Sequence, residues 1–240
     1  MSTDVSEAGS EDLRILILGK IPKTDEKEDR IEAEFENHHV RVKYAEGLCF
    51  APEDVEKVKT SFEESVESLS PGPHVILFVV EFGEFTRTDR NILEALTESF
   101  RDVRDHTIFM FTHGDKKLQV EDFIKDNTSL KIKPEEEEKY HLFTNVENVA
   151  AETEVLLKNI IEMKNKHPTT TGSFYSSEQL KTNSEKFFNK LTPDMKAEAG
   201  KEKVKPIPDV FKKLNPNIPQ AYAALTGIIH LICDLYCKHV

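Results

Sequence analysis

The residues best suited to chemistry form a short run of Gly, Lys and Thr directly after an apolar segment. Residues 13–18 read Leu-Arg-Ile-Leu-Ile-Leu, which predicts a buried strand, and the run that follows is Gly19-Lys20-Ile21-Pro22-Lys23-Thr24. A phosphate-binding loop has the pattern G-x-x-x-x-G-K-[ST], in which backbone N–H groups and the Lys hold phosphate oxygens and the hydroxyl binds Mg²⁺. Lys23 and Thr24 fit the last two positions, but the run is two residues short, and Pro22 replaces the second glycine without an N–H to donate. On the residues alone the run is typical of a plain polar loop after an edge strand, and a degenerate phosphate loop is the other interpretation.

Two further apolar runs belong to the elements that must position a site. The runs His74–Val80 and Thr107–Phe111 are continuous and rich in β-branched or aromatic residues, which is typical of strands buried on both faces. A helical pattern separates them, so the three segments predict a strand–helix–strand unit of a parallel sheet. Ligands of such sheets bind beyond the carboxyl ends of the strands, and Asp115 follows the second strand at that edge.

Three blocks in this region resemble the immunity-associated GTPases, the GIMAP or AIG-type family. The blocks are Pro71-Gly72-Pro73-His74, Gly83-Glu84-Phe85-Thr86-Arg87-Thr88-Asp89 and Phe111-Thr112-His113-Gly114-Asp115. A fainter resemblance extends from about Leu13 to about Leu180. The resemblance implies a doubly wound α/β fold like that of the P-loop GTPases, called a G domain, with GTP or GDP as the ligand.

The resemblance also implies which residues would contact the guanine base. Asp115 would accept hydrogen bonds from the N1–H and amino groups of guanine, and His113 would lie against the purine face. Asn145 follows the predicted strand Tyr140–Phe143, where the family places a segment around the base. An Asn after a strand more often forms a turn or a helix cap, so this structural role is the first interpretation of Asn145 and the base contact is the second.

The phosphate and metal side departs from the family pattern. GTPases carry Asp-Thr-Pro-Gly-Leu after the next strand, where the Asp organises Mg²⁺ and the Gly senses the γ-phosphate. This chain has Tyr44-Ala45-Glu46-Gly47-Leu48, so that only Gly47 and Leu48 remain. A phenol is a poor substitute for a carboxylate near Mg²⁺. We therefore expect GTP or GDP to bind weakly, no Mg²⁺ site and no catalytic residue.

The remaining elements are predicted from periodicity and caps. Thr86 or Thr88 can cap the helix after His74–Val80, with Asp89 completing a capping box with Thr86. The charged segment Asp25–Asn37 is helix-prone, and Val40–Tyr44 alternates as a half-buried strand. Further helices are predicted after Pro52, with an apolar stripe of Val55, Val58, Phe62, Val66 and Leu69; at Glu121–Lys125; through Val149, Val155, Leu156, Ile160 and Met163; and at Ser177–Leu191.

These elements divide the chain into four expected parts. Residues 1–12 are predicted to be a disordered tail and residues 13–166 the G-like domain. Residues 167–220 form a linker and helical extension, and residues 221–240 an amphipathic C-terminal helix.

The last of these parts combines a polar stripe with a broad apolar face. Thr226, His230, Asp234 and Lys238 recur every four residues, while Leu225, Ile228, Ile229, Ile232, Leu235 and Tyr236 cover the other side. The helix lacks the basic face that anionic lipid attracts. We expect it to dock on its own G domain or on a second copy, with membrane attachment as the alternative.

Composition narrows the class of protein. The net charge of -12 argues against generic binding to nucleic acid or anionic membrane. Three cysteines make no disulfide framework, and the N-terminus has no signal-peptide pattern, so a cytoplasmic location is expected. The sequence as a whole predicts a pseudo-GTPase that associates with protein partners, including itself or related GTPases. The alternative is a guanine-nucleotide-binding protein with slow GTPase activity.

Overall fold

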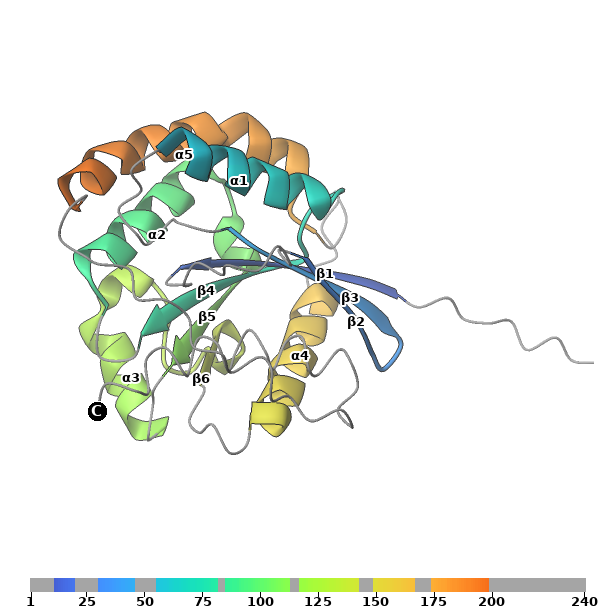
Figure 1. Cartoon of the computed structure of the whole chain (residues 1–240). Coiled ribbons are helices and arrows are strands. Elements are labelled where there is room, and N and C mark those ends of the chain that lie inside the picture. The colour runs from blue at the N-terminus through green and yellow to red at the C-terminus, as the bar shows by residue number, and fades with distance from the viewer. Residues whose placement is uncertain are drawn as a thin grey trace, which may run out of the picture.

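The computed structural model describes residues 11–19, 30–45, 55–81, 85–112, 117–142, 149–166 and 174–198 (Figure 1). Within these ranges the chain forms one twisted sheet with helices on both faces. The arrangement is the doubly wound α/β fold expected from the sequence.

The sheet has six strands in the order β2-β3-β1-β4-β5-β6. Their bounds are β1 Glu11–Gly19, β2 Arg30–Phe35, β3 His38–Tyr44, β4 Val75–Glu81, β5 Thr107–Thr112 and β6 Tyr140–Leu142. Neighbouring strands are parallel except β2, which pairs antiparallel with β3. Five strands therefore end at one carboxyl edge, and β2 begins there.

Five α-helices in the described part of the chain cover this sheet. They are α1 Val55–Ser68, α2 Arg87–Ser99, α3 Lys117–Asp126, α4 Val149–Lys166 and α5 Ser177–Glu198. Short 3₁₀ turns occur at Val103–His106, Thr128–Leu130 and Glu137–Lys139. In Figure 1, α1, α2 and α5 lie on one side of the sheet and α4 lies on the other. Among the described helices, none has the length and apolar character that crossing a bilayer requires.

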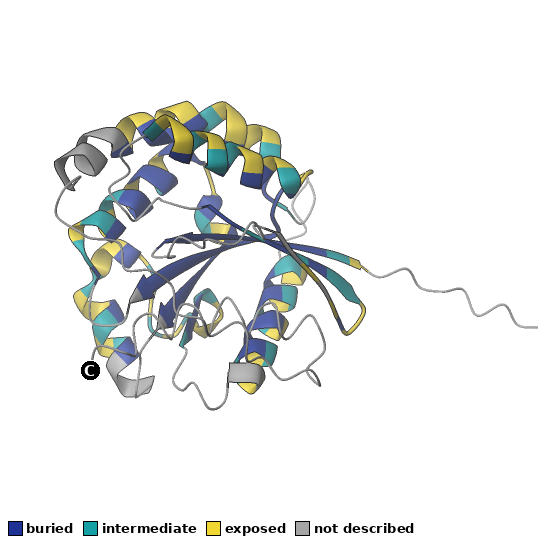
Figure 2. Ribbon diagram, viewed as in Figure 1, coloured by how far each residue is buried: buried dark blue, intermediate teal, exposed yellow. Residues whose placement is uncertain are grey.

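Because the central strands are buried on both faces, their side chains divide between two cores. Leu16 and Leu18 of β1 pack towards α1, α2 and α5, whereas Leu13, Ile15 and Ile17 pack towards α4. Figure 2 shows the central strands β1, β4 and β5 buried over most of their length, with exposed residues on the outer sides of the helices and along the β2–β3 side of the sheet. Alternation along each strand thus explains why the runs are apolar without interruption.

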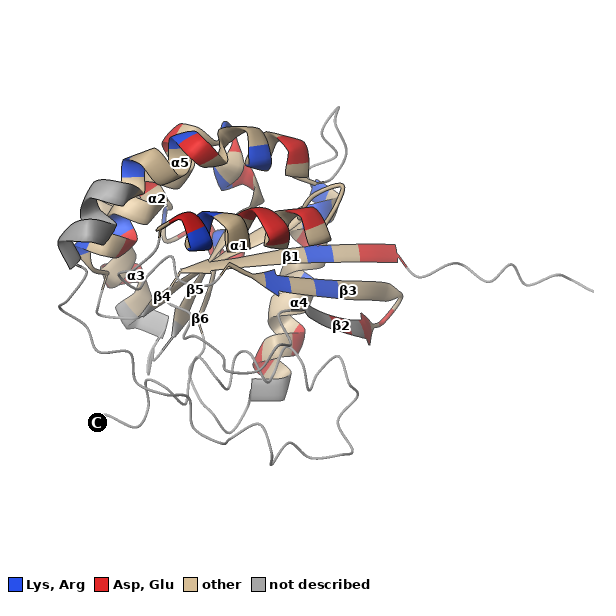
Figure 3. Ribbon diagram, turned by 45° about the horizontal axis from the view of Figure 1, so that its top comes forward, with Lys and Arg blue, Asp and Glu red and all other residues tan. Residues whose placement is uncertain are grey.

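Helix α5 belongs to the first of these cores. Phe187 and Phe188 meet Phe62 of α1 with ring centroids 5.7 Å apart in each case, and Phe187 lies 5.5 Å from the Phe100 ring. Charged side chains of both signs follow one another along the outer surfaces of α1 and α5 (Figure 3). Ion pairs such as Lys181–Glu67, 3.0 Å, join the two helices there. Residues beyond the expected domain end at 166 are therefore part of the domain's packing.

Several expected elements match the structure, and others are corrected. Thr86 is the N-cap of α2 and forms the predicted capping box with Asp89. The helix-prone segment 25–37 instead contains β2, because pairing with β3 outweighs local helix propensity. Strand β1 begins at Glu11, two residues inside the expected tail, and α5 continues past Leu191 to Glu198.

The face of α4 that packs in the core also differs from the predicted apolar stripe. Val155 is 51% exposed, and Leu157 packs in the core beside Leu156 and Ile160. The C-terminal helix expected at 221–240 lies outside the described residues.

Candidate functional site

The candidate nucleotide-binding residues end or follow four strands in the sequence. These strands are β1, β3, β5 and β6, whose last residues at the carboxyl edge of the sheet are Gly19, Tyr44, Thr112 and Leu142. Gly19 is described. The other candidates, Lys20, Lys23, Thr24, Gly47, His113, Asp115 and Asn145, lie outside the described residues. The fold thus brings their attachment points to one edge, and the placement of their side chains stays a prediction.

Gly19 ends β1 in a conformation that favours glycine. Its φ is +114°, and a Cβ at this position would lie 2.4 Å from the carbonyl oxygen and 2.9 Å from the nitrogen of Val79. Gly19 is paired with Val79 of β4, so the two backbones approach too closely for a side chain. β1 therefore ends in a backbone conformation and a close contact that only glycine accommodates, as the first glycine of a phosphate loop requires.

Tyr44 ends β3 at the position where GTPases carry the Mg²⁺-organising carboxylate. Its side chain is 5% exposed and packs in the core on the α4 side of the sheet. The Ser65 hydroxyl of α1 donates to the Tyr44 carbonyl oxygen at 3.3 Å. This residue is accordingly a core residue and offers no carboxylate to a metal ion.

The connection between β1 and β2 begins and ends at the same edge. Residue Arg30 at the start of β2 pairs with Lys43 near the carboxyl end of β3, beside the end of β1. Ten residues, 20–29, join Gly19 to Arg30. An eight-residue phosphate loop starting at Gly19 would use residues 19–26 and leave 27–29. A helix along the sheet needs roughly 10 residues more, whereas three remain.

The Thr and Asp of the second family block serve the start of α2. Asp89 is fully buried, and its Oδ2 accepts from the Thr86 backbone N–H at 2.8 Å and from the Thr86 hydroxyl at 2.6 Å. The Asp89 N–H donates to the Thr86 hydroxyl oxygen at 3.3 Å. Arg90 donates to the Phe85 carbonyl oxygen at 2.9 Å. These contacts satisfy the orphan N–H groups of the helix, which is a structural role.

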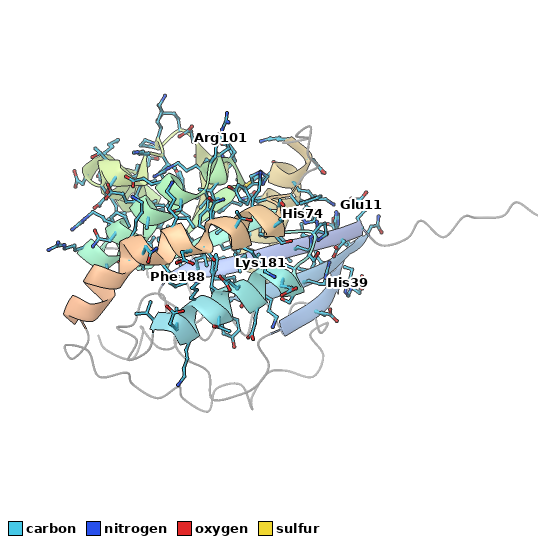
Figure 4. The ribbon with its side chains drawn as sticks, turned by 90° about the horizontal axis from the view of Figure 1, so that it is seen from above. Glu11, His39, His74, Arg101, Lys181 and Phe188 are labelled. Carbon is cyan, nitrogen blue, oxygen red and sulfur yellow. The ribbon has the colours of Figure 1, made fainter. Side chains whose placement is uncertain are left out.

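The first block, Pro71–His74, lies at the opposite edge from the candidate site. His74 is buried, donates its N–H to the Arg14 carbonyl oxygen at 2.8 Å and accepts the Arg14 N–H at Nδ1 at 2.9 Å (Figure 4). Burial, followed by the charge of Arg14, lowers the pKa of His74 to about 3. The imidazole is thus neutral and fixed at the start of β4.

The same block holds the chain that leads into α5. The Tyr175 N–H donates to the Pro73 carbonyl oxygen at 2.7 Å, and the Ser177 N–H donates to that of Pro71 at 2.8 Å. Gly72 has a φ of +147°, and a Cβ there would lie 1.9 Å from the Tyr175 carbonyl oxygen. Only glycine lets the two backbones pack this closely. We call residues 71–74 and 174–177 together the α5 latch.

Charged and aromatic side chains complete the latch. Arg14 is 5% exposed and donates through Nε to the Gly72 carbonyl oxygen, while its guanidinium lies 5.2 Å from the centre of the Phe174 ring. Asp12 pairs with Arg14 and with Arg41; burial raises its pKa, but hydrogen bonds from Arg41 and Arg14 outweigh this and hold it at about 2. The Tyr175 hydroxyl donates to the Arg101 carbonyl oxygen at 2.8 Å. Sequence reasoning missed this network, since an arginine within an apolar strand gives no local signal of its partners.

Metal binding has no support within the described ranges. No three His, Cys, Asp or Glu side chains there come together in a way that could hold an ion. His39 of β3 lies 2.6 Å from Glu34 and 4.0 Å from Glu32, both on the neighbouring strand β2.

Comparison with known proteins identifies the family. Residues 21–192, well over half of the chain, match the AIG1 family. The chain belongs to the AIG1 family. It is also 32% identical over 99 residues to the human "GTPase IMAP family member 8", covering 39% of this chain and 15% of that relative. The chain thus spans a small part of that relative's length. Membership implies the G-domain fold of a guanine-nucleotide-binding family, as the sheet order indicates.

Proposed function

We propose that this AIG1-family chain is a pseudo-GTPase that acts by binding other proteins and holds GTP or GDP weakly or not at all. The observation that carries the proposal is the ten-residue connection from Gly19 to Arg30. A nucleotide-binding G domain needs a phosphate loop, a helix that presents its N-terminus to the phosphates, and a segment that returns to the edge. Ten residues supply at most the first of these.

The phosphates are the part of the nucleotide that this loss affects. Catalysis and most affinity in P-loop proteins come from backbone N–H groups, Lys and Mg²⁺ around the β- and γ-phosphates. Pro22 has no N–H to contribute, and the connection is too short for the helix N-terminus that would add its dipole. Contacts from Asp115 to the base would have to act without this support.

Binding of Mg²⁺ is also disfavoured, because the residue at the carboxylate position is a buried tyrosine. Tyr44 occupies the carboxylate position, and its side chain is committed to the core at 5% exposure. Bringing it to the edge would give up the burial of an aromatic side chain, which stabilises by roughly 1.5–3 kcal/mol. Mg²⁺ requires hard oxygen ligands in near-octahedral geometry, which a buried phenol does not offer.

The alternative is a guanine-nucleotide-binding protein with slow GTPase activity. Gly19 favours it, because its φ of +114° gives β1 the exit that a phosphate loop uses. In that case Lys20, Lys23 and Thr24 would bind phosphate in an unusual loop.

One titration separates the two functions. Fluorescent GTP or GDP is titrated into the full chain, once with Mg²⁺ and once with a chelator. The Mg²⁺ concentration is about 5 mM, on the order of tenfold above the highest nucleotide concentration. The proposal predicts Kd values weaker than ~100 µM, unchanged by Mg²⁺. Sub-micromolar binding that requires Mg²⁺, or GTP turnover abolished by Lys23→Ala, would establish the alternative. Lys181→Ala on α5 is the matched control, since it removes the same side chain on a distant face.

A second arm tests the base site by itself. If GDP binds measurably, Asp115→Asn should weaken GDP and favour xanthosine diphosphate, because the amide replaces one acceptor with a donor. Equal GDP affinity in this variant would show that Asp115 does not read the base.

Association is tested by sedimentation of the full chain alone and mixed with a nucleotide-competent AIG1-family GTPase. A complex that forms without added nucleotide supports association as the activity. A chain that stays monomeric and unbound in every mixture contradicts it.

A further inference from the structure

The second face of the sheet is only partly covered by the helix described on it. The core on this face draws on five strands, β2, β3, β1, β4 and β5, and its helical members in the described ranges all come from α4. Five strands at ~4.8 Å spacing form a face roughly 20 Å wide, whereas a helix is ~10 Å across. Figure 1 shows α4 alone among the coloured helices on that side.

The path of α4 identifies the part of the face that it leaves. Six residues separate the end of β6, at the carboxyl edge, from the start of the helix, which lies against β4. Near its end Lys164 pairs with Glu11 at the amino end of β1, at 2.8 Å. Such a diagonal leaves one corner beside it, formed by the carboxyl-terminal parts of β1 and β3. Ile17, Val42 and Tyr44 lie at this corner, which we call the β1–β3 corner.

The corner is nevertheless buried. Val42 is 0% exposed and Tyr44 5% exposed, so other parts of the chain cover them. In a complete G domain the helix after the phosphate loop would lie there, because it connects β1 to β2 and so passes over β3. The ten residues 20–29 cannot form that helix, and seven of them are charged.

We infer that the C-terminal segment 221–237 docks on the β1–β3 corner and takes the place of the missing phosphate-loop helix. Outside the described residues, this is the one long apolar stretch, with a single charged residue, Asp234, in seventeen. As a helix it would be ~25 Å long, close to the length of β1. Residues 46–54 hold Leu48 and Phe50 but must lead into α1 on the opposite face.

The two faces of the segment suit this position. Ile228, Ile232 and their apolar neighbours would pack on Ile17, Val42 and Tyr44, and the stripe through His230 and Asp234 would face solvent. The 22 residues 199–220 reach up to ~70 Å when extended, enough to pass around the sheet from the end of α5. Attachment in the same chain gives a millimolar-scale effective concentration, which favours this occupant over a second copy. The inference stands whether or not nucleotide binds.

Hydrogen exchange on the full chain tests the docking. Amides of 221–237 and of Ile17, Val42 and Tyr44 should be protected together. Ile228→Glu with Ile232→Glu should speed exchange at both places by tenfold or more, while His230→Gln, on the polar stripe, should change neither. Unprotected amides in 221–237 of the unaltered chain would overturn the inference. An unchanged exchange rate of the β3 amides in the double variant would also overturn it.

Cross-linking of the unaltered chain gives a readout that does not depend on a variant folding. An amine-reactive linker should join Lys238 to Lys158 or Lys166 of α4, and not to Lys186 or Lys190 on the opposite face. Mixing heavy- and light-isotope protein separates links within a chain from links between copies. Links only between copies, links only to α5, or protection of 221–237 that needs lipid vesicles would each refute docking on the chain's own corner.

Discussion

Replacing Gly72 with Ala probes the α5 latch at its tightest point. The new Cβ would lie 1.9 Å from the Tyr175 carbonyl oxygen and 2.8 Å from the Ser177 nitrogen, both backbone atoms. Neither can move without carrying the start of α5 with it. The φ of +147° adds strain for any residue with a side chain.

The size of the effect follows from these contacts. A non-glycine residue in such a backbone region costs ~1–3 kcal/mol. Displacing the segment also breaks the bonds of Tyr175 to Pro73 and of Ser177 to Pro71, at about 1 kcal/mol each. We expect Gly72→Ala to lower the free energy of unfolding by ~3–5 kcal/mol, a large part of the ~5–15 kcal/mol of a domain.

Urea unfolding followed by circular dichroism measures this loss, and hydrogen exchange locates it. The α5 amides should lose protection in Gly72→Ala under conditions where β1 and β4 keep theirs. Ser70→Ala, at an exposed neighbouring position, is the control and should unfold like the unaltered chain. A Gly72→Ala protein within about 0.5 kcal/mol of the unaltered chain would refute the latch.

Three further predictions concern the turn, the buried histidines and the metal position. Glu36→Gly should raise the free energy of unfolding slightly, by about 0.5 kcal/mol, because Glu36 has a φ of +51° in the β2–β3 turn. A lower urea midpoint would contradict this. Burial lowers the folded-state pKa of His74 to about 3 and that of His141 to about 4. In the unfolded chain both residues titrate at about 6.5, so their contribution to the free energy of unfolding should be fully present above pH 6.5. Below that pH the free energy of unfolding should fall by up to ~1.4 kcal/mol per pH unit for each residue. His74→Gln should flatten that fall in urea titrations at pH 7 and pH 5, and an unchanged slope would contradict the assignment. Tyr44→Asp should cost ~3 kcal/mol or more in urea unfolding, because it buries a carboxylate, and should not create Mg²⁺-dependent GTP binding in the nucleotide titration.

The sheet could be predicted from sequence because its strands are buried on both faces. A continuous apolar run such as His74–Val80 predicts a strand, because the other apolar residues of the chain recur at helical spacing. The Thr86–Asp89 capping box predicts a helix start, because its side chains bond the N–H groups there. The helix prediction for segment 25–37 was wrong because the strand in it forms by pairing with β3. Propensity reports local preference and contains no information on a partner strand.

The latch could not be predicted for a related reason. Arg14 reads as one polar residue in an apolar strand, and its contacts with Gly72 and Phe174 join residues far apart in sequence. The Pro-Gly-Pro-His block was recognised as a family signature, but its role becomes visible only where Gly72 meets Tyr175. The candidate site was predicted from motif positions alone, and most of its residues lie outside the described ranges.

The position of the family blocks bears directly on what membership transfers to this chain. Of the blocks that carry the resemblance, Pro71–His74 holds α5 at the edge opposite the nucleotide site, and Thr86 with Asp89 caps α2. Both roles serve packing and would be kept whether or not the chain hydrolyses GTP. The residues that distinguish a hydrolase lie on the phosphate side, where a proline and a buried tyrosine stand and the connection has ten residues. Family resemblance here is therefore evidence for the scaffold, while nucleotide chemistry has to be judged from the phosphate side, on which our proposal of a pseudo-GTPase rests.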